Sequence, residues 1–291
     1  MSRRIHNQFV LLLLAAVAPW VGCIQPDSPP IDEAGRSLSG RVLPMPESLP
    51  VGWVTYEPGP DGLVQTPFPG LALRTVPEVY RELSAGTRRI AHWEFGRDGP
   101  TTLVLGGIHG GEHSPALLSF LFIQWLEANP GAVRRGRLVV APLVDPDGLE
   151  SGVRGNDNGI DLNRNYPARN FVGSARHGMR PASEAETRFV LMLMERYRPA
   201  CVVSIHAALA CMNYDGPAVD LAEAMSSACG LPVEPSVGYP TPGSFGSYSG
   251  IDLELPTITF ELRSKRTLQP DFDSCRAALL AAHQYTISHA R

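Results

Sequence analysis

The hydrophobic pattern from about residue 89 onward alternates between short apolar runs and segments with helical spacing. Apolar runs rich in β-branched residues predict buried strands, and apolar residues that recur every three or four positions predict helices. The predicted strands are residues 89–95, 101–105, 137–144, 201–205 and 257–262, and the predicted helices are residues 114–127, 184–197, 219–229 and 271–289. This alternation predicts an α/β layered domain, in which functional groups gather at strand ends.

The N-terminus has a different pattern, which predicts a lipoprotein-type signal peptide over residues 1–23. Two arginines precede an apolar run over residues 9–18 that is too short to span a membrane. The run leads to Gly22 and Cys23, which resemble a bacterial lipobox with Cys23 as the lipidated residue. We therefore expect export to the cell envelope or periplasm, with a lipid anchor at Cys23 as the contact with the membrane. A plain signal peptide cut nearby is the alternative.

Residues 24–70 are rich in Pro and Gly and show no helical or strand period. We interpret the first part as a tether and the rest as an irregular wrap on the domain surface, held in place by Trp53 and Tyr56. We predict one folded domain over residues 71–291.

Composition and cysteine content narrow the possible functions. The net charge is −4 and the pI is near 6.1, so nucleic-acid binding is not expected. Export makes disulfides possible, and Cys201, Cys211, Cys229 and Cys275 remain after Cys23. Four cysteines allow three full pairings, and buried reduced thiols are the alternative.

The strongest chemical signal is a His and a Glu three residues apart, directly after the predicted strand 101–105. His109 and Glu112 lie among glycines, which favour a tight loop over a helix. A catalytic zinc ion commonly takes three protein ligands and leaves its fourth position to water. His206 follows the predicted strand 201–205 and is the candidate for the third ligand.

Two further segments supply groups that a zinc hydrolase needs. Glu261 lies on the predicted strand 257–262, where a carboxylate is costly unless it is paired or functional, and it is the candidate general base. Arg154, Asn163 and Arg164 lie in a loop rich in Gly and Asn. One arginine would hold a substrate carboxylate while the other stabilises a developing oxyanion.

Taken in order along residues 103–263, these motifs resemble the zinc carboxypeptidases of the carboxypeptidase A type. Arg154-Gly-Asn with Asp161-Leu-Asn-Arg-Asn, and the segment 237–247, are most similar to the bacterial murein peptide amidases. The resemblance implies a mixed, mostly parallel twisted sheet flanked by helices. It also implies a zinc peptidase whose catalytic domain hydrolyses a C-terminal amide bond in peptidoglycan-derived peptides, between γ-D-Glu and diaminopimelate.

The resemblance also implies roles for individual residues. One Zn²⁺ per chain would be bound by His109, Glu112 and His206. Glu261 would be the general base, and Arg154 would polarise the scissile carbonyl. Asn163 and Arg164 would hold the free carboxylate of the leaving residue, Tyr239 would correspond to a mobile lid tyrosine, and Gly243 and Ser244 would line the pocket.

Three alternatives remain open at this stage. The run from His109 to His113 also matches the inverted zinc motif H-x-x-E-H, which belongs on a helix. A zinc deacylase of N-acyl amino acids, similar to succinylglutamate desuccinylase or aspartoacylase, would use a similar scaffold. A lipoprotein that binds wall peptides without cleaving them is the alternative that is not an enzyme.

Overall fold

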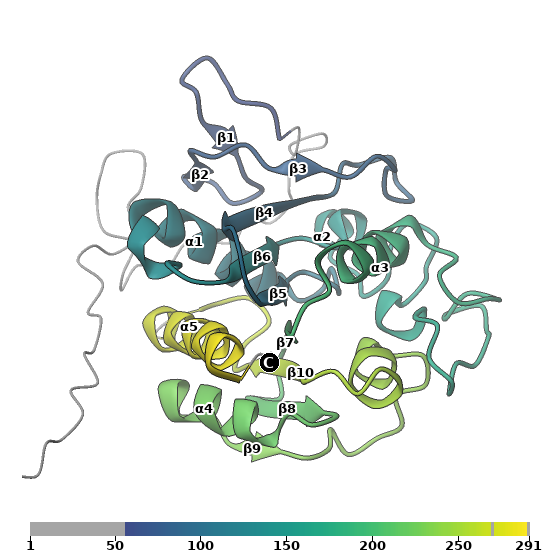
Figure 1. Cartoon of the computed structure of the whole chain (residues 1–291). Coiled ribbons are helices and arrows are strands. Elements are labelled where there is room, and N and C mark those ends of the chain that lie inside the picture. Colours follow the sequence, from purple (N-terminus) through teal and green to yellow (C-terminus); the bar gives the residue numbers. More distant parts are fainter. Residues whose placement is uncertain (1–55, 269–270, 290–291) are drawn as a thin grey trace, which may run out of the picture.

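The computed structural model describes residues 56–268 and 271–289, and a mixed sheet forms the centre of this part of the chain (Figure 1). The sheet has eight strands in the order β3-β4-β6-β5-β7-β10-β8-β9. The central strands β6, β5, β7 and β10 are parallel to one another, whereas β3, β4 and β8 each run antiparallel to a neighbour. The strand bounds, in sheet order, are Glu78–Val79, Ala91–Gly96, Arg137–Ala141, Thr101–Leu105, Cys201–Ala207, Thr257–Leu262, Cys211–Asp215 and Val233–Glu234.

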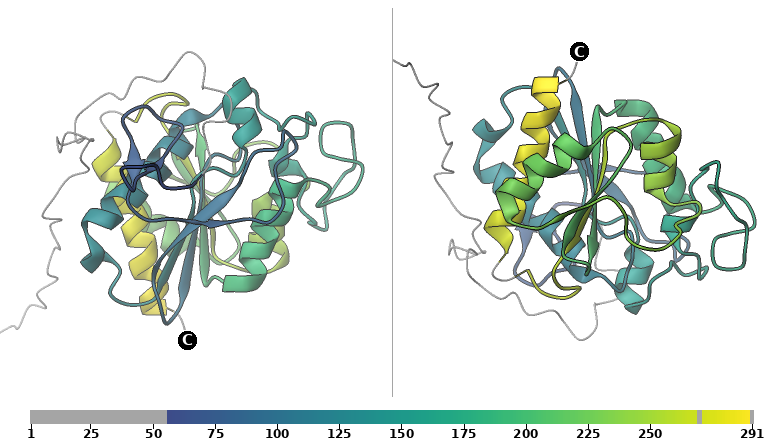
Figure 2. Two further views of the ribbon diagram at one scale, coloured as in Figure 1. Left: turned by 90° about the horizontal axis from the view of Figure 1, so that it is seen from above. Right: turned by 90° about the horizontal axis from the view of Figure 1, so that it is seen from below.

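Helices cover both faces of the sheet, as the two further views show (Figure 2). The first face buries apolar residues of α1 (His113–Ala128), α4 (Val219–Cys229) and α5 (Phe272–His289). The second face buries apolar residues of α3 (Ala185–Tyr197). The expected mixed, mostly parallel sheet flanked by helices is therefore confirmed.

Several predicted elements match the structure closely. The helix over 219–229 and the strand over 257–262 have the predicted bounds. β7 continues two residues beyond the predicted end, so His206 lies within the strand. β6 ends three residues before the predicted end. Both differences lie at strand ends, which the sequence marks less clearly than the strands themselves.

Some elements were missed by the sequence pattern. β8 carries the sequence Cys-Met-Asn-Tyr-Asp and has no β-branched residue that would have predicted a strand. The short helix α2 (Pro146–Ser151) and the π-helical segment Ser247–Asp252 were also not predicted. β8 becomes a strand because it pairs antiparallel with β10.

The described part of the N-terminal wrap packs onto the core. The Tyr56 side chain is buried, and its ring contacts Trp93 edge-on at a centroid distance of 5.6 Å. The expectation that Tyr56 anchors the segment is confirmed. The expectation that no strand forms before residue 70 is wrong, because β1 (Val64–Gln65) pairs with β2 (Ala72–Leu73). The signal peptide, Cys23 and Trp53 lie outside the described residues.

Two observations concern the membrane and the cysteines. Among the helices of the described residues, none is long and apolar enough to cross a membrane. The four cysteines at positions 201, 211, 229 and 275 are all free in the structure, so it contains none of the three possible pairings.

Candidate active site

The first two candidate ligands lie in the loop that joins β5 to α1. This loop packs tightly against the start of α2, since a Cβ atom added to Gly110 would lie only 1.7 Å from the carbonyl carbon of Gly148. Only glycine permits that approach, and Gly107 has a positive φ of 58° that also favours glycine. The glycines around His109 thus shape the loop so that His109 and Glu112 turn towards one point.

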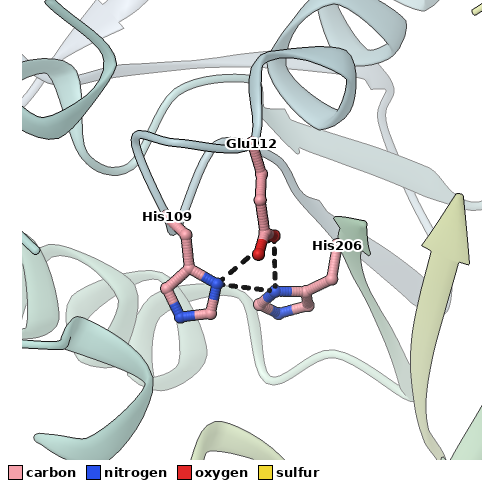
Figure 3. A group of neighbouring side chains, drawn as sticks. All are labelled: His109, Glu112 and His206. Carbon is pink, nitrogen blue, oxygen red and sulfur yellow. Dashed lines mark hydrogen bonds and ion pairs between the residues drawn. The ribbon is translucent and has the colours of Figure 1, made fainter. Parts of the chain in front are cut away.

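The third candidate ligand reaches the same point from the sheet. His206 lies on β7, and its Nδ1 atom is 3.2 Å from Nδ1 of His109 and 3.5 Å from Oε2 of Glu112. His109 Nδ1 lies 3.3 Å from the same carboxylate oxygen. Figure 3 shows the side chains of His109 and Glu112, from the loop, converging with that of His206, from the strand. The structure therefore brings together all three residues that the sequence predicted as ligands.

The spacing of these atoms fits a tetrahedral metal ion. Zinc bonds of about 2.0–2.1 Å at tetrahedral angles separate the ligand atoms by roughly 3.3 Å. The observed separations of 3.2 to 3.5 Å agree with that value. Two histidines and a carboxylate are also donors that zinc accepts. The residues present thus fit a zinc ion.

A second set of contacts orients the two imidazoles. His109 Nε2 lies 3.1 Å from Oδ1 of Asp161, and His206 Nε2 lies 3.0 Å from the Ser204 hydroxyl. A hydrogen bond on the far ring nitrogen leaves Nδ1 free to bind a metal. Asp161 was part of a motif singled out in the sequence, but no role was predicted for it. The sequence feature that could have pointed to Asp161 is its position in the same short motif as Asn163 and Arg164.

Electrostatics keep the Glu112 carboxyl ionised. Burial opposes its ionisation, but hydrogen bonds with His109 and His206 more than offset that effect and hold its pKa below the usual range. A deprotonated carboxylate is the form that binds a metal. Arg154 and Lys265 add positive charge, with nitrogen atoms 3.6 and 3.8 Å from Glu112 Oε1.

Glu261 enters the site on β10, the parallel neighbour of β7. It is register partner of His206, and both side chains line one cavity of about 400 Å³. Glu261 is 7% exposed, and its carboxylate accepts a hydrogen bond from the Leu209 amide at 3.3 Å. The candidate base is thus held at the cavity wall beside the predicted metal ligands.

The predicted loop arginines both reach the cavity. Arg154 Nε donates to Asp161 at 2.7 Å, which aims the guanidinium along the metal site. Arg164 has no carboxylate partner among the described residues, and burial lowers its pKa. The Asn163 amide oxygen accepts from the Phe245 backbone at 2.8 Å, which fixes the loop against the segment after residue 243.

The predicted pocket residues lie in different places. Tyr239, whose side chain is about half exposed, and Ser244 line the cavity. Gly243 instead packs under the Arg164 backbone, where an added Cβ would lie 2.4 Å from the Arg164 carbonyl oxygen. The cavity is also lined by residues for which no role was predicted: Lys265, Asn213, Asp215 and Thr259.

Comparisons with known proteins agree with this geometry. Residues 79–220 match a family model described as zinc carboxypeptidase. Murein peptide amidase A of Escherichia coli K12 is 40% identical over 175 residues, which cover 55% of this chain and 69% of that protein. The chain belongs to the zinc carboxypeptidase family. Murein peptide amidase A of Vibrio campbellii is 33% identical over 177 residues, covering 55% of this chain and 68% of that protein.

Solved structures give the same family and fold. The murein-tripeptide amidase of Escherichia coli O157 is 33% identical, covers 72% of this chain and 93% of its own, and has a TM-score of 0.62. Thrombin-activatable fibrinolysis inhibitor has the same fold with a TM-score of 0.63 at 17% identity, over 74% of this chain and 72% of its own. Membership of this family makes the protein a peptide-bond hydrolase of the murein peptide amidase type and implies zinc at the site.

Proposed function

We propose that this protein is a metallocarboxypeptidase that removes the C-terminal residue from murein peptides by cutting the bond between γ-D-Glu and diaminopimelate. The observation that supports this most is the convergence of His109, Glu112 and His206 on a cavity that also holds Glu261 and Arg164. The amidase names of the relatives at 40% and 33% identity support the substrate. The proposal includes one zinc ion per chain.

The proposed mechanism gives each of these side chains a role. His109, Glu112 and His206 would hold the zinc ion, which when bound activates water and polarises a carbonyl as a Lewis acid. Glu261 takes a proton from the attacking water and passes it to the amine that leaves. General base catalysis of this kind contributes about 10²–10⁴-fold.

The two arginines have separate roles in this mechanism. Arg154 lies next to Glu112 and donates towards the carbonyl oxygen as negative charge develops on it. Arg164, which has no carboxylate partner among the described residues, and Asn163 bind the free carboxylate of the leaving residue. Tyr239 lies at the exposed rim of the cavity, where it would cover bound substrate.

The experiment compares bond types with the zinc-loaded protein. L-Ala-γ-D-Glu-diaminopimelate and α-linked tripeptides are incubated separately, and products are identified by mass spectrometry. Release of diaminopimelate from the γ-linked peptide alone supports the proposal. Cleavage of α-linked peptides alone would keep the carboxypeptidase chemistry and contradict the substrate. If neither peptide is cleaved but N-acyl amino acids are hydrolysed, the result favours the deacylase. If the wall peptide is bound and not cleaved, the result favours the binding lipoprotein.

The proposed location rests on the sequence of residues 1–23. An apolar run that ends at Gly22-Cys23 predicts export and lipidation, so the enzyme would meet peptides of the cell wall in the periplasm or cell envelope. Radiolabelled palmitate incorporated into the wild-type chain and not into a Cys23→Ala variant would support the anchor. No incorporation into the wild type would contradict it.

A further inference from the structure

The cavity contains a carboxylate that the mechanism does not use. Asp215 lies at the end of β8, lines the same cavity as the metal ligands, and has no hydrogen bond or ion pair with any described residue. Burial raises the pKa of its carboxyl group, and no neighbouring charge offsets this effect. A half-buried acid without a partner is costly, so its presence needs an explanation.

The strand register places Asp215 on the same face of the sheet as the proposed base, Glu261. β8 pairs antiparallel with β10, with Glu261 opposite Cys211, Thr259 opposite Asn213 and Thr257 opposite Asp215. Paired residues point to the same face of a sheet, and side chains alternate along each strand. Glu261, Thr259, Asn213 and Asp215 all line the cavity. Asp215 therefore ends a row of side chains that begins at the base.

The row leaves room for an extended side chain of the substrate. Thr257, the partner of Asp215, lies four positions before Glu261 on β10, which corresponds to about 13 Å of strand. The bond to be cut lies at the Glu261 end. A side chain of lysine length on the leaving residue would extend from there along this row of side chains towards Asp215.

Two glycines keep space for this carboxylate. A Cβ atom added to Gly246 would lie 2.1 Å from Asp215 Oδ2, and one added to Gly250 would lie 2.3 Å from its Cβ. Any larger residue at either position would displace the Asp215 side chain. The segment that follows Ser244 thus accommodates an acid at this point of the cavity wall.

We propose that Asp215 is a specificity-determining residue that binds an ammonium group at the far end of the leaving residue's side chain. This proposal rests on the proposed function and specifies its substrate: the leaving residue is a diamino acid of the lysine or diaminopimelate type. Arg164 binds the α-carboxylate of that residue and Asp215 binds its distal ammonium. Arg164 and Asp215, neither of which has an ion-pair partner among the described residues, thereby match two opposite charges of one substrate.

The test uses three peptides that differ only in the leaving residue. L-Ala-γ-D-Glu is followed by meso-diaminopimelate, by L-lysine or by L-norleucine, which has the shape of lysine without most of its polarity. We expect kcat/KM of the wild type to be about 10- to 100-fold higher for the two diamino acids than for norleucine. In Asp215→Asn that advantage disappears, because cleavage of the diamino acid peptides falls and cleavage of the norleucine peptide does not.

Controls separate recognition from folding. Asp215→Asn keeps the shape of the side chain and removes an unpaired charge, so its Tm and zinc content should equal or exceed those of the wild type. Asp220→Asn, which removes the same charge from the exposed start of α4, should leave all three rates unchanged. Equal loss on all three peptides in Asp215→Asn, or no loss on any, would overturn the proposal.

Failure of the proposed function gives a different result. If the wild type cleaves none of the γ-linked peptides, the proposed murein substrate is wrong. The same comparison of wild type and Asp215→Asn is then made with α-linked peptides that end in lysine or in norleucine. Preference for lysine that depends on Asp215 would then still support the role of Asp215. Absence of that preference would overturn it.

Discussion

Glu261 and His206 are register partners on adjacent parallel strands, β10 and β7. The proposed general base and the proposed third metal ligand are therefore held side by side by the hydrogen bonds of the sheet. The other two ligands come from the loop after β5, which is the strand on the other side of β7. Three neighbouring strand ends thus position the reacting groups.

The first prediction concerns the base. Glu261→Gln keeps the hydrogen-bond acceptor for Leu209 but cannot accept a proton, so kcat should fall by about 10²–10⁴-fold. Zinc content, measured by mass spectrometry of the metal, should equal that of the wild type because Glu261 is not a ligand. Activity within a few-fold of the wild type would contradict the assignment.

The second prediction separates the two zinc motifs. His113 begins α1 and is not among the described residues whose atoms converge with His109 and Glu112. His206→Ala should lose stoichiometric zinc, and His113→Ala should keep it. The reverse pattern would support the H-x-x-E-H motif instead.

The third prediction concerns the carboxylate behind His109. Asp161→Asn keeps an acceptor for the Asn163 amide but loses the charge that orients the imidazole. Zinc affinity should fall by about 10- to 100-fold. Competition with a chromogenic chelator measures it, and unchanged affinity would show that Asp161 does not support the metal site.

The fourth prediction concerns Arg164, the proposed binding group for the substrate's terminal carboxylate. Substrates with an amidated C-terminus lack the charge that Arg164 is proposed to bind, so the wild type should cleave them about 10- to 100-fold less efficiently than the free acids. Arg164→Gln should lose this discrimination, mainly through a higher KM for the free acids. An Arg164→Gln enzyme that still prefers free acids would place the carboxylate site elsewhere.

The fifth prediction concerns a buried acidic group away from the cavity. Burial raises the pKa of Glu186 to about 7, although the Ala85 amide and Asn156 donate hydrogen bonds to its carboxylate. The folded protein therefore holds a proton that the unfolded chain releases at lower pH, so this group weakens stability as pH rises from about 4.5 to about 7.

Glu186→Gln removes this effect because it does not ionise. With zinc saturated, its Tm relative to the wild type should rise between pH 5 and pH 8 and level off above that range. The measurement is a thermal melt of both proteins across the pH series. A constant Tm difference across the series would contradict the shifted ionisation.

The sequence predicted the metal ligands because they belong to short local motifs at strand ends. His109 and Glu112 are three residues apart, and His206 directly follows a strongly apolar run. It could not predict Asp215 as part of the site, because β8 lacks a strand-forming pattern and becomes a strand through pairing with β10. Asp161 was missed for a different reason: a carboxylate in a loop motif carries no local sign that it will contact a histidine of another loop.

The most direct test of the account is metal removal and return on the tripeptide. The wild-type protein, stripped of metal by a chelator and dialysed, is titrated with zinc while release of diaminopimelate from L-Ala-γ-D-Glu-diaminopimelate is followed. The account predicts no release without metal and full release at one zinc per chain. Release that persists in the stripped protein, or none at any zinc concentration, would contradict it.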